Sequence, residues 1–190
     1  DTLRWSILRP DIPFLLGTWG ERTLRACIDH VAEVKIGGSA NPDVVPHFRR
    51  MIDAAAAAQG RQGAATEIVI GAVCVVDEDR TAARALARRE VALYLPVIAD
   101  LDPTVEIEPD RLAALRAAAA AYDFDAGAAL ISDELLARFA FAGAPADIVD
   151  QSLALADAGA ARVEFGTPHG LTPARGLDLL GGKVLPILRH

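Results

Sequence analysis

Glycines, hydroxyl side chains and a histidine occur in three segments that each follow a short apolar run and precede a helical stretch, at residues 16–20, 36–42 and 165–170. Glycine lets the backbone approach a ligand closely, and the free N–H groups at a helix start favour an anion. The first two segments therefore predict contacts to the phosphate of a cofactor or substrate. The candidate cofactor-binding residues are Gly17, Thr18, Gly37, Gly38 and Ser39. The same residue types also occur in ordinary turns between strands and helices, and both interpretations stay open at this point.

The third segment places His169 just beyond the end of a predicted strand. A histidine there could serve as an acid, a base or a substrate contact. A loop histidine whose ring is hydrogen-bonded to a backbone carbonyl is the alternative. Trp19, in the first segment, could stack on a planar ring or pack at the rim of a site.

Several catalytic motifs are absent from the sequence. It contains no HExxH, His-x-His or Asp-x-Asp-x-Asp spacing, so no metal site is predicted. It also lacks the GxSxG elbow of serine hydrolases, the phosphate-binding loop of Walker-type nucleotide hydrolases and the GxGxxG pattern of dinucleotide-binding folds. Cys27 and Cys74 have no CxxC spacing, which argues against a disulfide scaffold or a zinc site.

Composition narrows the class of protein. The chain has 190 residues, of which 52% are hydrophobic, and a formal net charge of −7. An acidic chain is a poor nucleic-acid binder, and no apolar run reaches the roughly 18 residues that cross a bilayer. We therefore expect a soluble, cytoplasmic α/β protein with neither a nucleic-acid nor a membrane partner. Because the chain opens on Asp1, we also expect it to be a processed or partial chain.

Short apolar runs alternate with helical stretches along the chain. The predicted strands are Ile12–Leu16, Glu33–Ile36, Glu67–Val76 and Arg162–Phe165. The predicted helices span 21–32, 41–58, 79–96, 111–122, 133–139, 145–158 and 172–190. The part from about 100 to 140 interrupts the alternation and is interpreted as an insertion. Four strands that are each followed by a helix predict either a doubly wound sheet or a (β/α)8 TIM barrel, and in both folds ligands bind at the carboxyl ends of the strands.

Three stretches read IPFLLGTWGERTLRACIDHVAEVKIGGSANPDVV, EIVIGAVCVVDEDRTAARALARREVALYL and FAGAPADIVDQSLALADAGAARVEFGTPHG. They resemble the bacterial-luciferase-like oxidoreductases, and most closely the deazaflavin-dependent branch that includes methylenetetrahydromethanopterin reductase. The resemblance implies a TIM barrel with an insertion before its last β/α unit. It matches residues 1–190 to one domain, the C-terminal half of that barrel, with strands five to eight. The N-terminal half is then missing from this chain or supplied by another.

The resemblance also implies a function. In the family, the loops after the fifth and sixth strands hold the phosphate-bearing tail of the flavin or deazaflavin, which matches Gly17 and Thr18, then Gly37, Gly38 and Ser39. Arg138 matches a region near the substrate, and we predict it, with His169, as substrate-binding. The implied reaction is hydride transfer between coenzyme F420 and a small organic molecule. No catalytic residue is predicted, because the family's catalytic groups belong to the other half.

Two alternatives remain for the function. The first is an FMN-dependent monooxygenase of the same fold, since the tail-binding residues alone do not separate FMN from F420. The second is a non-catalytic half-barrel that acts as a binding or regulatory subunit. The family resemblance further implies a homo-oligomer.

Overall fold

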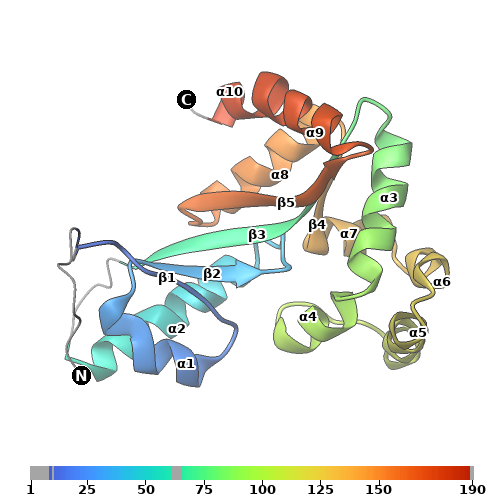
Figure 1. Ribbon diagram of the computed structural model, residues 1–190. Helices are drawn as coiled ribbons and strands as arrows, with labels where there is room; N and C mark the ends of the chain where they lie inside the picture. Colours follow the sequence, from blue (N-terminus) through green and yellow to red (C-terminus); the bar gives the residue numbers. More distant parts are fainter. Residues whose placement is uncertain (1–8, 10, 61–65, 189–190) are drawn as a thin grey trace, which may run out of the picture.

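The computed structural model describes residues 9, 11–60 and 66–188, which form a sheet of five parallel strands with helices packed against it (Figure 1). The strands are β1 (Leu15–Gly17), β2 (Glu33–Gly37), β3 (Glu67–Val76), β4 (Ala140–Gly143) and β5 (Arg162–Gly170). The predicted range of β3 is confirmed, and it is buried along nearly its whole length, as expected for a central parallel strand.

The sheet is organised around β3, which pairs with three other strands. Val69 of β3 lies opposite Lys35 of β2 on one edge and opposite Arg162 of β5 on the other. Further along β3, Val73 pairs with Ala140 of β4. β5 pairs with β3 along both of these regions and therefore occupies one whole edge of β3. β2 and β4 lie one after the other along the opposite edge.

The helices are α1 (Glu21–Cys27), α2 (Val44–Ala58), α3 (Arg80–Ala92), α4 (Leu95–Leu101), α5 (Pro109–Ala120), α6 (Phe124–Ala129), α7 (Asp133–Phe139), α8 (Pro145–Asp157), α9 (Pro173–Leu179) and α10 (Leu185–Leu188). A 3-10 turn, Ile28–His30, follows α1, and a π-helical turn, Leu180–Val184, joins α9 to α10. Figure 1 shows α1 and α2 below β1 and β2, α8 to α10 beyond β5, and α3 to α7 at the carboxyl end of β3. No helix in the described part of the chain is long and apolar enough to cross a membrane.

The two faces of the sheet differ in chemistry. Val34 and Ile36 of β2 are buried with Ile68 and Ile70 of β3 in a core that also includes residues of α1, α2 and α8. Because strand side chains alternate between faces, the charged residues between these apolar ones lie on the opposite face. Those residues are Glu33, Lys35, Arg162 and Glu164. The face opposite α1, α2 and α8 is therefore charged along β2 and β5, whereas nearer the carboxyl end of β3 it packs against α3 and α7.

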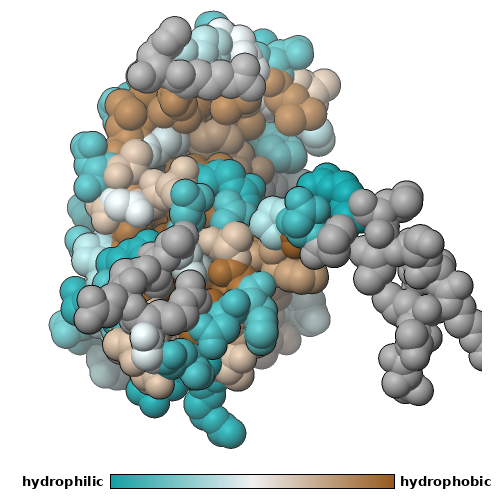
Figure 2. Space-filling model, turned by 90° about the vertical axis from the view of Figure 1, so that its left-hand side faces the viewer, coloured by the Kyte–Doolittle hydropathy of each residue, from teal (hydrophilic) through white to brown (hydrophobic). Residues whose placement is uncertain are grey.

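The outer edges of β1 and β5 pair with no other strand in the described residues. Beside β1, the side chains of Ile12, Phe14 and Leu15 are exposed. Figure 2, which views the molecule from the left-hand side of Figure 1, shows hydrophobic surface between hydrophilic residues on this end of the molecule. An unpaired edge strand with apolar side chains beside it is typical of a sheet that is continued by further strands.

Two strands differ from their predicted limits. β1 covers Leu15–Gly17 in place of Ile12–Leu16, because these are the residues that pair with β2. β5 continues through the predicted loop to Gly170, because a register shift lets His169 pair with Val75. The structure also adds β4 to the four predicted strands. β4 is formed by pairing with β3, which lies more than sixty residues earlier in the chain, and local pattern does not indicate such a contact.

Helix limits also differ in places. α2 begins at Val44 and not at Asn41, because the side chain of Asn41 accepts a hydrogen bond from the Asp43 N–H and donates to residues of the insertion. The predicted helix over 21–32 ends at Cys27 and continues as the 3-10 turn, and α6 was not predicted. The predicted range of α7 is confirmed, and Ser132 caps it by accepting the Leu135 N–H.

Candidate functional site

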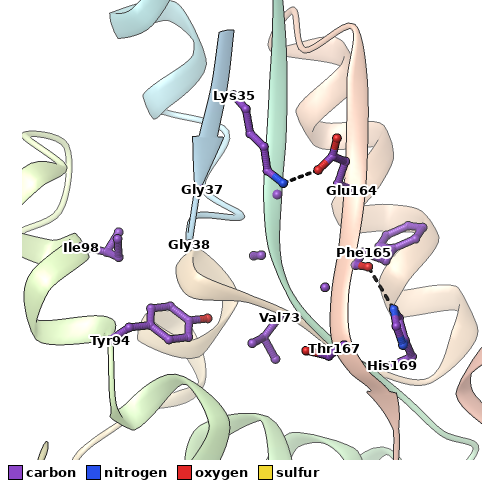
Figure 3. A pocket seen from close by; sticks show the side chains of 13 residues that line it. Lys35, Gly37, Gly38, Val73, Tyr94, Ile98, Glu164, Phe165, Thr167 and His169 are labelled. Atoms are coloured by element: carbon purple, nitrogen blue, oxygen red, sulfur yellow. Dashed lines mark hydrogen bonds and ion pairs between the residues drawn. The ribbon is translucent and has the colours of Figure 1, made fainter. Parts of the chain in front are cut away.

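An open pocket of about 620 Å³ lies over the charged face of the sheet, toward the carboxyl ends of β2, β3 and β5. Its lining residues are Lys35, Gly37, Gly38, Gly71, Ala72, Val73, Tyr94, Ile98, Glu164, Phe165, Gly166, Thr167 and His169. Figure 3 shows Tyr94 and Ile98 on one side of this pocket, and Glu164 and His169 on the other. The location agrees with the expectation that ligands bind at the carboxyl ends of parallel strands.

The floor of the pocket is largely bare backbone. Gly37 of β2 is in register with Gly71 of β3, so two glycines lie side by side on neighbouring strands. A methyl group added at Gly37 would meet no atom within 4 Å, which shows that the space above this residue is open. Gly166 of β5 adds a third glycine to the floor. Where a strand carries glycine and the space above it is open, as at Gly37, a planar ring can contact the backbone.

Lys35 and Glu164 form an ion pair at one end of this floor. The Lys35 side chain lies across Gly71, where an added methyl group would come within 2.9 Å of Lys35 Cε. Arg162 extends the pairing, because it donates to Glu164 Oε1 at 2.8 Å and to both carboxylate oxygens of Glu33. The hydrogen bonds that Arg162 donates to Glu33 raise the pKa of Arg162 further, so this guanidinium stays charged.

Tyr94 and Ile98 provide the apolar wall of the pocket. Gly38 has a φ of +82°, and a methyl group there would lie 2.9 Å from Ile98 Cγ1, so both the turn and the wall require glycine. The Tyr94 hydroxyl donates to the Phe139 carbonyl at 3.2 Å. Burial raises the pKa of Tyr94 above its ordinary value, so the phenol stays neutral and acts as wall and donor.

His169 is one of the predicted residues that line this pocket. Its ring Nε2 lies 3.2 Å from the carbonyl oxygen of Phe165, as the backbone-paired alternative expects. The other ring nitrogen leaves room for a second contact, so the two interpretations are compatible. Among the predicted residues, Gly37 and Gly38 line the pocket together with His169.

Gly17, Thr18 and Ser39 do not line this pocket. Gly17 ends β1, and the hydroxyl of Thr18 accepts the Gly20 N–H at 3.0 Å. Ser39 is fully buried, and its Oγ accepts the Asn41 N–H at 3.1 Å. The Ser39 hydroxyl therefore supports the loop after β2 from inside the protein. Trp19 donates to the Gly37 carbonyl at 3.0 Å and packs edge-on against Phe48. These contacts agree with the second interpretation of Trp19, that it packs at the rim of a site.

Arg138 lies outside the pocket, in a partly buried polar group that we call the Asn41 cluster: Asn41, Asp102, Thr104 and Arg138. Asn41 is fully buried and donates to Asp102 at 3.2 Å and to Thr104 at 2.7 Å. Arg138 donates to the Asn41 side-chain oxygen at 2.9 Å, and its carbonyl accepts the Ala40 N–H. The cluster thus joins the loop after β2 to the insertion, and in this structure Arg138 serves that connection.

Sequence reasoning missed Lys35, Gly71, Tyr94 and Glu164 as lining residues. Signals existed for two of these residues. Lys35 is a lysine between the buried residues of a short strand, and Gly71 is a glycine inside a strand rich in β-branched residues, which typically marks a close approach. Within residues 9, 11–60 and 66–188, no group of three histidine, cysteine or acidic side chains is placed to hold a metal ion.

Comparison with known proteins connects this geometry to a family. Residues 2–162 match the family model described as luciferase-like monooxygenase. The chain is 29% identical over 186 residues to the 5,10-methylenetetrahydromethanopterin reductase of Archaeoglobus fulgidus, covering 94% of this chain and 55% of the relative. The chain therefore spans about half the length of the curated relatives it matches.

Solved structures match over the same extent. The coenzyme F420-dependent tetrahydromethanopterin reductase of Methanopyrus kandleri superposes with a TM-score of 0.80 at 23% identity, covering 93% of this chain and 51% of that one. An F420-dependent secondary alcohol dehydrogenase gives a TM-score of 0.66 at 13% identity, covering 96% of this chain and 50% of that one. These likenesses confirm the predicted TIM-barrel fold, of which this chain covers about half. With its family model matched over most of its length, the chain belongs to the luciferase-like monooxygenase family.

Proposed function

We propose that the complete protein is a coenzyme F420-dependent oxidoreductase that transfers a hydride between the deazaflavin and an organic substrate, as methylenetetrahydromethanopterin reductases do. The observation that carries the proposal is the glycine floor of the pocket, formed by Gly37 at the carboxyl end of β2 with Gly71 and Gly166 from the middle of β3 and β5. The likeness to two F420-dependent enzymes supports the deazaflavin over FMN.

The residues of the pocket fit a planar ring system. The open space above Gly37 leaves room for a ring to contact the backbone, while Tyr94 and Ile98 offer an apolar side wall. When bound, the deazaflavin supplies the hydride acceptor or donor carbon. The protein's part is to hold the ring face toward the substrate, and the apolar wall excludes water from that face.

The loops after β1 and β2 are the proposed contacts for the cofactor's phosphate-bearing tail. Gly17 and Thr18 lie beside β2 because Gly17 pairs with Lys35, and the Thr18 N–H donates to the Lys35 carbonyl at 3.2 Å. Gly37 and Gly38 follow on the next strand. Ser39 and Arg138 hold the second loop in place from behind, and His169 is the proposed substrate contact at the far side of the pocket.

Completion of the barrel is part of the proposal. The unpaired edges of β1 and β5 are the places where further parallel strands, in the same chain or in a partner, would continue the sheet. In that arrangement residues 1–190 form the C-terminal half of one barrel domain, with residues 100–140 as its insertion. A homo-oligomer is expected from the family resemblance.

The test is cofactor binding by the complete protein, compared with a Gly37→Val variant. Because a Cβ added at Gly37 meets no protein atom within 4 Å, we expect the variant to fold normally while the valine side chain fills the floor of the pocket. We expect wild type to bind oxidised F420 in equilibrium dialysis and to reduce it with a hydride donor. The variant should bind at least about tenfold more weakly, a loss of roughly 1.4 kcal/mol.

Gly181→Ala is the matched control, since this glycine also has open space around it and lies in the π-helical turn, away from the pocket. Its F420 affinity should equal that of wild type. Binding of FMN in place of F420, with oxygen consumption in the presence of a flavin reductase, would show the alternative monooxygenase. A complete protein that binds neither cofactor would contradict the proposal.

A further inference from the structure

We propose that Lys35 selects for negative charge in the pocket: its ammonium leaves Glu164 and pairs with an anionic group of the bound molecule. The inference rests on the proposed function, because it concerns the pocket assigned to the cofactor. The anionic group is a ring edge that carries the charge delivered by a hydride, or a carboxylate of the substrate. In both cases the recognising chemistry is an ammonium on a flexible stem.

The first argument is that the two members of the ion pair have different numbers of ionic partners. Glu164 has two cationic partners, Lys35 at Oε2 and Arg162 at Oε1. Among the described residues, Glu164 is the one ionic partner of Lys35. When Lys35 moves to a ligand, Glu164 keeps its hydrogen bond from Arg162, so no carboxylate is left unpaired.

The second argument is that Arg162 cannot take the same role. Its Nε and Nη2 donate to the two carboxylate oxygens of Glu33 at 3.1 and 2.7 Å, and its Nη1 donates to Glu164. The guanidinium is thus held from two sides. Within the described part of the chain, Lys35 has a single ionic partner. Its four-carbon stem crosses Gly71, where no Cβ restricts its movement.

The third argument is position. Lys35 is the one lysine or arginine among the described residues that line the pocket, and its side chain is 34% exposed. Figure 3 shows its ammonium at the edge of the open floor, with Gly37 and Gly38 beyond it. A hydride brings two electrons and one proton to a neutral ring, so the ring gains one negative charge. A cation beside the floor favours that charged form over the neutral one.

The experiment measures dissociation constants for oxidised and reduced F420 by anaerobic equilibrium dialysis, using the complete protein. Lys35→Met should weaken binding of the reduced cofactor at least about tenfold more than binding of the oxidised cofactor, and Lys35→Arg should recover part of the loss. Glu164→Gln should leave reduced F420 bound as tightly as in wild type or more tightly, because it removes the competitor for Lys35.

Lys183→Met is the matched control. It removes the other lysine of this chain, which pairs with Glu78 away from the pocket, and all cofactor affinities should stay unchanged. If Lys35→Met alters only the KM for methylenetetrahydromethanopterin, with kcat and cofactor affinities unchanged, the anion belongs to the substrate and the inference stands.

Two results would overturn the inference while leaving the proposed function intact. In the first, Lys35→Met has the same cofactor affinities and the same KM as the control Lys183→Met. In the second, Lys35→Met and Glu164→Gln weaken cofactor binding equally, as is expected if the ion pair has a purely structural role. If wild type binds FMN and not F420, the proposed function fails, and the same variants tested with oxidised and reduced FMN decide the role of Lys35. Binding of neither cofactor would overturn both.

Discussion

Lys35 and Glu164 meet across a strand to which neither belongs. Lys35 is on β2 and Glu164 on β5, and β3 lies between these two strands. Gly71 of β3 is the residue over which the lysine stem passes. The ion pair therefore depends on the absence of a side chain at one position of the central strand.

Gly71→Ala should displace Lys35 at little cost in stability. The added methyl group would lie 2.9 Å from Lys35 Cε and 3.5 Å from Glu164 Cβ, and the end of a lysine side chain can move away. We expect the free energy of unfolding to fall by less than about 1 kcal/mol, while the affinity for reduced F420 changes as it does in Lys35→Met. Urea unfolding and equilibrium dialysis on the same preparations check both quantities.

Gly170→Ala provides the contrast for that variant. A methyl group there would lie 2.7 Å from Gly176 Cα and 2.8 Å from the Val76 carbonyl oxygen, which are backbone atoms that cannot move aside. Its loss of unfolding free energy should be about 1–3 kcal/mol, as for other overpacked sites. Equal losses in the two variants would show that Lys35 is not free to move.

Asn41→Leu should be strongly destabilising, because it leaves the buried carboxylate of Asp102 and the Arg138 guanidinium without their Asn41 hydrogen bonds. The expected loss of unfolding free energy is about 1–3 kcal/mol. Arg116→Ala, in the insertion that Asn41 contacts, is the control: it breaks an exposed pair with Asp100, which is worth less than about 1 kcal/mol. Chemical unfolding curves for the two variants should therefore separate clearly, and overlapping curves would contradict a structural role for the Asn41 cluster.

The carboxylates after β3 should make stability depend on acid pH. Hydrogen bonding and charge from Lys183 lower the pKa of Glu78, and a backbone hydrogen bond from Asp79, together with Arg175, lowers the pKa of Asp77. A carboxyl group with a lowered pKa in the folded state stabilises the fold above its ordinary pKa, and this contribution disappears as pH falls through the lowered value. The melting temperature of wild type should exceed that of Lys183→Met above about pH 5, and the difference should shrink toward about pH 3. A difference that is constant with pH would show that Lys183 acts through packing alone.

The parts of the fold that local pattern determines could be predicted from the sequence. The limits of β3 are confirmed because a long apolar run rich in β-branched residues leaves little choice, and those of α7 because Ser132 caps its start. β4 could not be predicted: its four residues include two alanines and a glycine, and they form a strand by pairing with Val73–Val76.

The candidate site was predicted in part, for a similar reason. Gly37, Gly38 and His169 follow the ends of the predicted strands, where the rule for parallel sheets places ligands, and they do line the pocket. Arg138 comes from the insertion, and its position depends on Asn41, almost a hundred residues earlier. The pairing of Lys35 with Glu164 joins two strands that are not adjacent, so no short segment of sequence contains it.

The return of β4 to β3 has a consequence for how this protein can diversify. The chain leaves β3 at Val76, and β4 brings it back beside that same residue; the Asp77 N–H donates to the Gly143 carbonyl at 3.0 Å. Residues 77–139 therefore leave the end of β3 and return to the same strand, where Ala140 lies opposite Val73, and their length does not affect the register between β3 and β5. Since doubling a closed loop costs only about 0.6 kcal/mol, this excursion can gain or lose whole helices over evolutionary time while the barrel strands stay in place.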